Sequence, residues 1–185
     1  MRRARKPSIE NERERGLIQS AADLSPAPGL HLRPCADSKL KFKIPISVLV
    51  VIHTADLQVL LLERADHPGY WQSVTGSQNA GETLPQTAAR EVAEETGLDV
   101  RLHPLSDWHL QNEYEIFPEW RWRYAPGVTH NAEHVFGLLV PSAIAPRLSA
   151  REHLSYVWLP WEQAAQRCFS WSNAAAIRSL PKRIH

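Results

Sequence analysis

Three glutamates stand close together near the middle of the chain, at Glu91, Glu94 and Glu95. In a helix, residues three and four positions apart lie on neighbouring parts of one face, so these carboxylates would crowd together. Like charges at this spacing destabilise a helix, whereas Mg²⁺ or Mn²⁺ would turn the repulsion into coordination by oxygen ligands. The cluster therefore indicates either a metal site or a solvated acidic face with Arg90 as a local partner.

The surrounding residues predict a short helix that carries the cluster. Thr83 and Gln86 have the spacing of a capping box, so we expect the helix to begin near Leu84. Gly97 stands where a left-handed residue ends many helices, so we expect the last helical residue near Thr96. The acidic groups would then lie on the last turns of the helix, where they oppose the helix dipole. Structure alone would not favour carboxylates there, and this supports the metal site.

A fixed spacing links the helix to a glycine-rich turn before it. Five residues separate Gly76 from Glu82, seven more separate Glu82 from Arg90, and the pattern continues through Leu98. This pattern resembles the signature of the Nudix hydrolases at every specified position. The resemblance implies an α+β protein with the Nudix fold, an α/β/α sandwich around a mixed β-sheet. It also implies that Glu82 and Arg90 form a supporting charge pair that fixes the loop.

The same resemblance assigns roles to the carboxylates. It implies that Glu91, Glu94 and Glu95 are catalytic, as metal-binding and water-activating groups. Mg²⁺, with Mn²⁺ as an alternative, would be held by Glu91, Glu95 and an acidic residue outside the signature, for which Glu152 is the candidate. Glu94 is left open between a metal ligand and a base. The implied activity is hydrolysis of a nucleoside diphosphate linked to a variable group.

Length and composition favour a single domain. The chain has 185 residues, which is enough for one sizeable core. We expect a disordered extension over residues 1–38, where large apolar residues are few, and a Nudix hydrolase domain over residues 39–185. Lys and Arg number 21 against 20 for Asp and Glu, giving a net charge of +1, so charge points to neither nucleic acid nor an anionic membrane.

Cysteine usage and hydropathy bear on the compartment. Cys35 and Cys168 stand in no metal-binding spacing, so we expect two free thiols in a reducing cytoplasm and no disulfide. The longest apolar run, residues 46–52, is too short to cross a bilayer. We therefore expect a soluble cytoplasmic protein, with its oligomeric state left open.

Apolar periodicity places further elements around the predicted helix. A hairpin is expected before it, and strands followed by two helices are expected after it. The predicted strands cover residues 45–53, 57–63, 70–75, 99–108, 110–117 and 133–140, with another strand following Glu152; the predicted helices cover residues 161–168 and 174–180.

The run from Trp120 to Val128 alternates aromatic and arginine side chains. Aromatic rings offer stacking surfaces and guanidinium groups bind phosphate, so the run could hold a flat heterocycle that carries phosphates. The alternative is a β-hairpin whose aromatics pack in a core or an interface while its arginines are solvated. The sequence leaves open whether Arg121 and Arg123 face a ligand.

Segments outside the signature, over about residues 43–180, resemble the branch of the Nudix family that acts on 7,8-dihydroneopterin triphosphate in bacterial folate biosynthesis. This resemblance implies cleavage of that small molecule to its monophosphate and pyrophosphate. The alternatives are a house-cleaning pyrophosphatase for nucleotides such as dATP, and a Nudix-fold sensor without catalysis. The substrate contacts implied by the resemblance are Lys43, Arg64, Thr75, Tyr114, Glu115, Ile116, Phe117 and Ser170.

Overall fold

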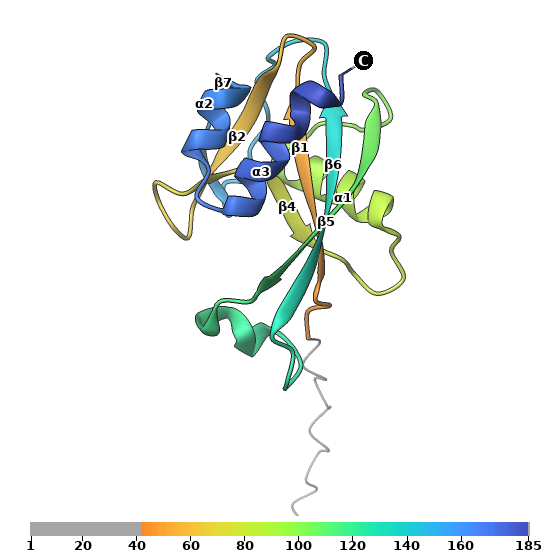
Figure 1. Ribbon diagram of the computed structural model, residues 1–185, viewed down its shortest axis with the longest axis vertical. Helices are drawn as coiled ribbons and strands as arrows, with labels where there is room; N and C mark the ends of the chain where they lie inside the picture. The colour runs from red at the N-terminus through yellow and green to blue at the C-terminus, as the bar shows by residue number, and fades with distance from the viewer. Residues whose placement is uncertain (1–41, 185) are drawn as a thin grey trace, which may run out of the picture. The chain divides into compact units, whose positions relative to one another are not determined.

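The computed structural model describes residues 42–184, so the extension predicted over residues 1–38 and Cys35 lie outside the described residues. The described part alternates strands with a few short helices (Figure 1). In chain order the elements are β1 (Ile46–His53), β2 (Gln58–Arg64), β3 (Trp71–Gln72), β4 (Val74–Ser77), α1 (Leu84–Thr96), β5 (Leu105–Glu115), the 3₁₀ helix η1 (Pro118–Arg123), β6 (His130–Leu139), β7 (His153–Pro160), α2 (Trp161–Arg167), α3 (Trp171–Ser179) and the 3₁₀ helix η2 (Leu180–Lys182).

The strands form one mixed sheet around β1. The order is β3-β2-β1-β6-β5, and in addition β4 pairs with β1 and β7 pairs with β2. The pairing of β1 with β6 is parallel, and the other strand pairs are antiparallel. The predicted mixed sheet is therefore confirmed.

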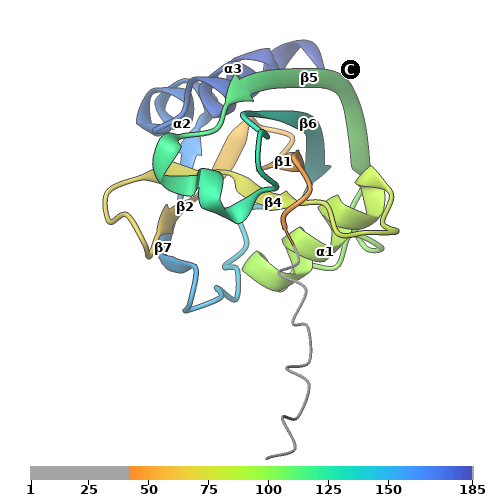
Figure 2. The same cartoon turned by 90° about the horizontal axis from the view of Figure 1, so that it is seen from below.

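Helices cover both faces of this sheet, which Figure 2 shows with α1 on one side and α2 and α3 on the other. Successive side chains of a strand point to opposite faces of the sheet. The side chains of β1 are apolar on both faces, because helices cover both. Val48 and Val50 pack with Ala88 and Val92 of α1. Leu49 packs in the other cluster with the apolar residues of α2 and α3. The predicted α/β/α sandwich is confirmed.

The predicted helix after the glycine-rich turn is confirmed at both ends. Helix α1 runs from Leu84 to Thr96, and Thr83 and Gln86 form the capping box. Gly97 ends it with φ of 71° in the left-handed region. Local chemistry therefore fixes the length of the element that carries the three glutamates.

Several predicted elements differ in the structure. The strands predicted over residues 99–108 and 110–117 form one strand, β5, and the helix predicted over residues 174–180 begins earlier, at Trp171. Residues 99–104 form turns rather than a strand, because Asp99 accepts hydrogen bonds from the backbone and side chain of Arg101. The aromatic and arginine run begins in η1 and continues as a loop, so the hairpin alternative is wrong. Pro118 stands in the first turn of η1, where its missing N–H costs no hydrogen bond. Among residues 42–184, no helix is both long and apolar enough to span a membrane.

Candidate active site

Helix α1 directs its glutamates to two different environments. Glu91 and Glu95, one helical turn apart, are buried with 9% and 4% of their surface exposed. Glu94 lies on the exposed side of the helix and pairs with Arg90 at 3.1 Å. The structure therefore separates one glutamate of the predicted catalytic group from the other two.

Gly76, in β4, lets the backbone approach Glu91 closely. A Cβ atom at Gly76 would lie 1.8 Å from the carboxyl carbon of Glu91, which no side chain could tolerate without displacing that carboxylate. The glycine of the signature is thus explained by a close approach of backbone and side chain. Any side chain at this position would compete with Glu91 for the same space.

Arg90 ties the loop to the helix. Its guanidinium donates two hydrogen bonds to Glu82, at 2.7 and 3.1 Å, and a third to the backbone carbonyl of Ser77 at 3.0 Å. It also binds Glu91 at 2.7 Å. The hydrogen bonds from Arg90, more than any other cause, hold the pKa of Glu82 well below its usual range. This is the supporting pair that the resemblance implies, and it fixes the glycine-rich loop beside Glu91.

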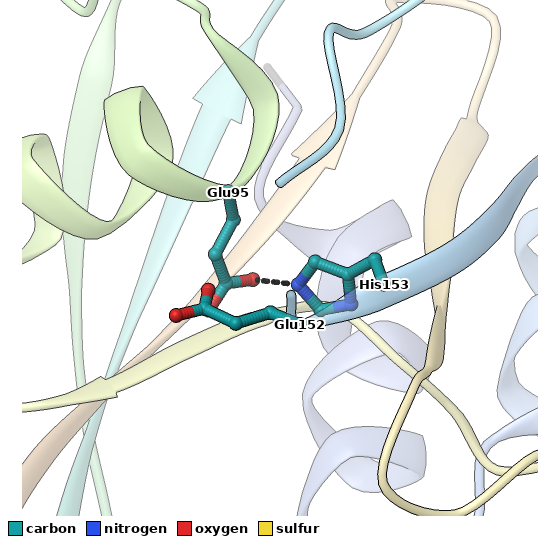
Figure 3. A group of neighbouring side chains, drawn as sticks. All are labelled: Glu95, Glu152 and His153. Atoms are coloured by element: carbon teal, nitrogen blue, oxygen red, sulfur yellow. Dashed lines mark hydrogen bonds and ion pairs between the residues drawn. The ribbon is translucent and has the colours of Figure 1, made fainter. Parts of the chain in front are cut away.

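Glu152, directly before β7, places a further carboxylate near Glu95 of α1. Figure 3 shows the side chains of Glu95, Glu152 and His153 turned toward one another. His153 Nε2 lies 2.9 Å from a carboxylate oxygen of Glu95, and both residues are buried whereas Glu152 is exposed. One potential ligand atom from each residue lies within 4.8 Å of the other two. His153 was not predicted, although it directly follows the predicted ligand Glu152.

These residues fit a divalent cation. Burial raises the pKa of Glu91 to about 7 and also raises the pKa of Glu95, because a carboxylate loses hydration in the interior. A bound cation would favour the ionised form of both, and carboxylate oxygens are the ligands that Mg²⁺ and Mn²⁺ prefer. Glu95 and Glu152, with Glu91 one turn away, offer such oxygens, and His153 adds an imidazole nitrogen.

The side chains of Glu91, Glu95 and Glu152 line a cavity of about 640 Å³. Its walls come from the segment before β1, the ends of β2, β5 and β6, the glycine-rich loop, η1 and the start of α3. Ile116 is buried outside the lining, and Glu82, Arg90 and Glu94 also lie outside it. The predicted residues that line the cavity are Glu91, Glu95, Glu152, Lys43, Arg64, Thr75, Tyr114, Glu115, Phe117 and Ser170.

Arg64 is held rigidly in the cavity wall. Its guanidinium donates to both carboxylate oxygens of Asp66, at 2.8 and 2.6 Å, and to Gln72 Oε1 at 3.0 Å. It also lies 5.6 Å from the ring centroid of Trp120 and 5.9 Å from that of Phe169. Such a fixed guanidinium loses little further entropy when it binds an anion.

Lys43 is the second cation of the wall that the sequence singled out. Its ammonium lies 3.4 Å from the hydroxyl of Ser77 in the glycine-rich loop. Burial, followed by the nearby charge of Arg123, lowers the pKa of Lys43. Both Lys43 and Arg123 therefore gain from an anion in the cavity.

The aromatic and arginine run divides between cavity and solvent. Trp120, Arg123 and Tyr124 line the cavity, whereas Trp122 is exposed. Arg121 is not part of the lining; it forms an ion pair with Glu115 and a hydrogen bond to the carbonyl of Ile116. Of the two arginines that the sequence left open, Arg123 faces the cavity.

Strand β6 supplies cavity residues that sequence reasoning missed. Asn131 and Glu133 line the cavity although both are almost fully buried. The available signal was the alternation of these two polar residues at the beginning of an otherwise apolar strand, which places both on one face. Their neighbours on the same wall include Ser47 and Tyr114.

Comparison with known proteins identifies the family. The profile of the NUDIX domain matches residues 43–180. The chain is 48% identical to the dihydroneopterin triphosphate diphosphatase of Escherichia coli (strain K12) over 142 residues, which cover 75% of this chain and 93% of that protein. It is 43% identical to the protein of the same name from Haemophilus influenzae, with 75% and 89% covered.

A solved structure agrees with the sequence comparison. The E. coli dihydroneopterin triphosphate pyrophosphohydrolase superposes with a TM-score of 0.71 and 46% identity, covering 77% of this chain and 98% of that one. The family expected from the spacing of Gly76, Glu82 and the glutamates of α1 is confirmed. On the match of its domain, its sheet and its signature, the chain belongs to the Nudix family.

Proposed function

We propose that the protein hydrolyses 7,8-dihydroneopterin triphosphate to dihydroneopterin monophosphate and pyrophosphate, a step of folate biosynthesis. The observation that carries this proposal is the pair of relatives named for this activity, which align with 43% and 48% identity over 89% and 93% of their own lengths. The cavity supports it, because aromatic rings, cations and a carboxylate cluster line one space of about 640 Å³.

The triphosphate chain would be bound by cations of the cavity wall. Arg64 is oriented by Asp66 and Gln72, and Lys43 lies beside the glycine-rich loop. Fixed guanidinium and ammonium groups stabilise phosphate oxygens without reorganising, which is how most catalysis of phosphoryl transfer is achieved. Arg123, whose backbone carbonyl accepts a hydrogen bond from the backbone N–H of Lys43, would add a third positive charge.

Mg²⁺ is the cofactor that we assign to the carboxylate site. Glu95 and Glu152, together with Glu91, would hold it. A divalent cation there supplies neutralisation of charge on the phosphate oxygens and lowers the pKa of a nearby water. The buried pair of Glu95 and His153 keeps the Glu95 carboxylate in one orientation before any cation arrives.

We assign to Glu91 the role of accepting the proton of the attacking water. It lines the cavity, where an ionised carboxylate can accept a proton from a water held near the cation. Glu94 remains a catalytic candidate from the family resemblance, but its exposed position and its pairing with Arg90 favour a smaller effect. Glu94→Gln should therefore lose less activity than Glu91→Gln.

The proposal is tested by pyrophosphate release from purified protein with Mg²⁺. 7,8-Dihydroneopterin triphosphate and dATP are offered separately, and kcat/KM is compared. A preference of about tenfold or more for the pterin, with the monophosphate as the other product, is expected. Equal or reversed preference would leave Nudix hydrolysis in place and move the function to clearance of nucleotides, and binding without release of pyrophosphate would favour a sensor.

A further inference from the structure

A second polar cluster lies in the wall of the same cavity, apart from the Nudix signature. Asn131 and Glu133 of β6 are 2% and 4% exposed, and both line the cavity. Strand pairing sets Ser47 of β1 beside Glu133, and sets Asn112 and Tyr114 of β5 opposite Glu133 and Asn131. Strand pairing thus brings five polar side chains together.

The carboxylate of Glu133 is buried without a cation. It accepts a hydrogen bond from Asn112 Nδ2 at 3.2 Å, and Ser172 is a neighbour in the cavity wall. Among residues 42–184, no Lys, Arg or His forms an ion pair with it. A carboxylate can accept about four hydrogen bonds, and burying one without a partner is costly. Glu133 therefore keeps acceptor capacity that its neighbours do not use.

Two amides beside it also have unused atoms. Asn131 donates to Ser47 Oγ at 2.7 Å and to Tyr114 Oη at 3.1 Å, which leaves its Oδ1 without a partner in the described part of the chain. Asn173 accepts from Ser73 Oγ at 3.0 Å, and its Nδ2 is likewise unpartnered there. Buried polar atoms are nearly always hydrogen-bonded, so this part of the cavity wall keeps hydrogen-bonding capacity that the described residues do not use.

We propose that Glu133 selects the substrate by accepting hydrogen bonds from the 2-amino group and the adjacent ring N–H of a 2-amino-4-oxopyrimidine edge. Pterins carry this edge, and guanine carries the same pattern of donors. Adenine presents a ring nitrogen acceptor next to its amino group, so a carboxylate would face an acceptor and lose a hydrogen bond. That the natural ligand is a pterin rests on the proposed function, whereas recognition of the 2-amino-4-oxopyrimidine edge by Glu133 does not.

The test compares Glu133→Gln with the matched control Glu113→Gln. Glu113 is an exposed residue of β5 that lies outside the cavity. A glutamine keeps the shape of Glu133 but offers one acceptor and one donor group in place of two acceptors. For each protein, kcat/KM is measured with 7,8-dihydroneopterin triphosphate and with dATP, and the ratio of the two values is the readout.

In Glu133→Gln the ratio should fall by roughly tenfold to a hundredfold, because glutamine can accept a hydrogen bond from only one of the two donors on the pterin edge. In Glu113→Gln the ratio should stay within about threefold of the wild-type ratio, since a solvated charge contributes little. A Glu133→Gln protein that is active but keeps the wild-type ratio would overturn the proposal.

A second measurement needs no variant. The wild-type protein is offered dGTP and dITP, which differ only in the 2-amino group. Loss of a hydrogen bond to a charged acceptor should lower kcat/KM for dITP by about tenfold or more, and equal values would overturn the proposal. A wild-type protein that is inactive on the pterin would refute the proposed function, while the comparison of dGTP with dITP would still decide the role of Glu133.

Discussion

Replacing Glu91 by glutamine should stabilise the metal-free protein above neutral pH while removing most of its activity. Glu91 is buried against Gly76 and the loop, and burial raises its pKa from 4.5 to about 7. The folded protein therefore resists ionisation of this carboxyl, although the proposed reaction requires it. Glutamine has nearly the same shape and does not titrate, so it isolates the electrostatic cost.

The magnitude follows from the two pKa values. A carboxyl whose pKa is raised by folding makes its full contribution to stability below the unfolded pKa, and that contribution is lost as pH rises through the folded pKa. With values of 4.5 and about 7 for Glu91, raising the pH from about 5 to about 8 lowers the free energy of unfolding of the wild type by about 2.5 kcal/mol. Glutamine at this position does not ionise, so the Glu91→Gln protein does not lose this part of its free energy of unfolding.

Urea denaturation in the presence of EDTA measures this difference at both pH values. The free energy of unfolding of the Glu91→Gln protein relative to the wild type should rise by about 2.5 kcal/mol between about pH 5 and about pH 8. Glu113→Gln, an exposed change, should leave the pH dependence as it is in the wild type. Parallel pH dependence in the wild type and the Glu91→Gln protein would refute the reasoning.

Adding Mg²⁺ should reduce the stability advantage of the Glu91→Gln protein over the wild type. A ligand at a hundred times its dissociation constant stabilises the folded state by about 2.7 kcal/mol, and loss of Glu91 should weaken that binding. The wild type should therefore gain more stability from Mg²⁺ than the Glu91→Gln protein gains, above about pH 8. Equal gains would show that Glu91 does not contribute to the cation site.

Three further changes test other parts of the site. Glu95→Gln should lower kcat with Mg²⁺ by at least about 100-fold, equal to about 2.7 kcal/mol of lost transition-state stabilisation, and a near-normal rate in a pyrophosphate assay would contradict the metal site. Arg90→Lys should lower the free energy of unfolding by about 1–3 kcal/mol in urea titrations, because an ammonium group cannot make all the hydrogen bonds by which the guanidinium joins Glu82 and the carbonyl of Ser77 to the helix. The matched control Arg101→Lys, at an exposed residue, should change it by less than about 0.5 kcal/mol. Gly76→Ala should lose activity by about tenfold or more, since its methyl group would displace the Glu91 carboxylate, and unaltered kcat/KM would refute that close approach.

The sequence predicted the catalytic helix well because its signals are local. Capping by Thr83, the left-handed Gly97 and the spacing of the glutamates all act within one or two turns. The family pattern then supplied the sandwich, and the continuous apolar run of β1 agrees with it, because helices cover both faces of the sheet. Elements whose ends are set by residues close to them in the sequence could therefore be predicted.

The polar cluster around Glu133 was not predictable in the same way. Glu133 is one acidic residue in a strand, and its significance depends on Asn112 from β5 and Ser172 at the beginning of α3. Burial, missing cations and unpartnered amides are properties of the folded chain. The exposure of Glu94 also depends on tertiary packing, because the signature treats it as equivalent to Glu91 and Glu95.

The bond between Ser73 and Asn173 joins residues 100 positions apart, and the pair of Glu95 and His153 joins residues 58 apart. Contacts of such long range require large loops to close, so they form slowly relative to local helices. The cavity wall is therefore complete only when α3 has docked on the sheet. During refolding, catalytic activity should return after the helical signal of α1, so enzyme turnover reports the completion of the fold rather than its beginning.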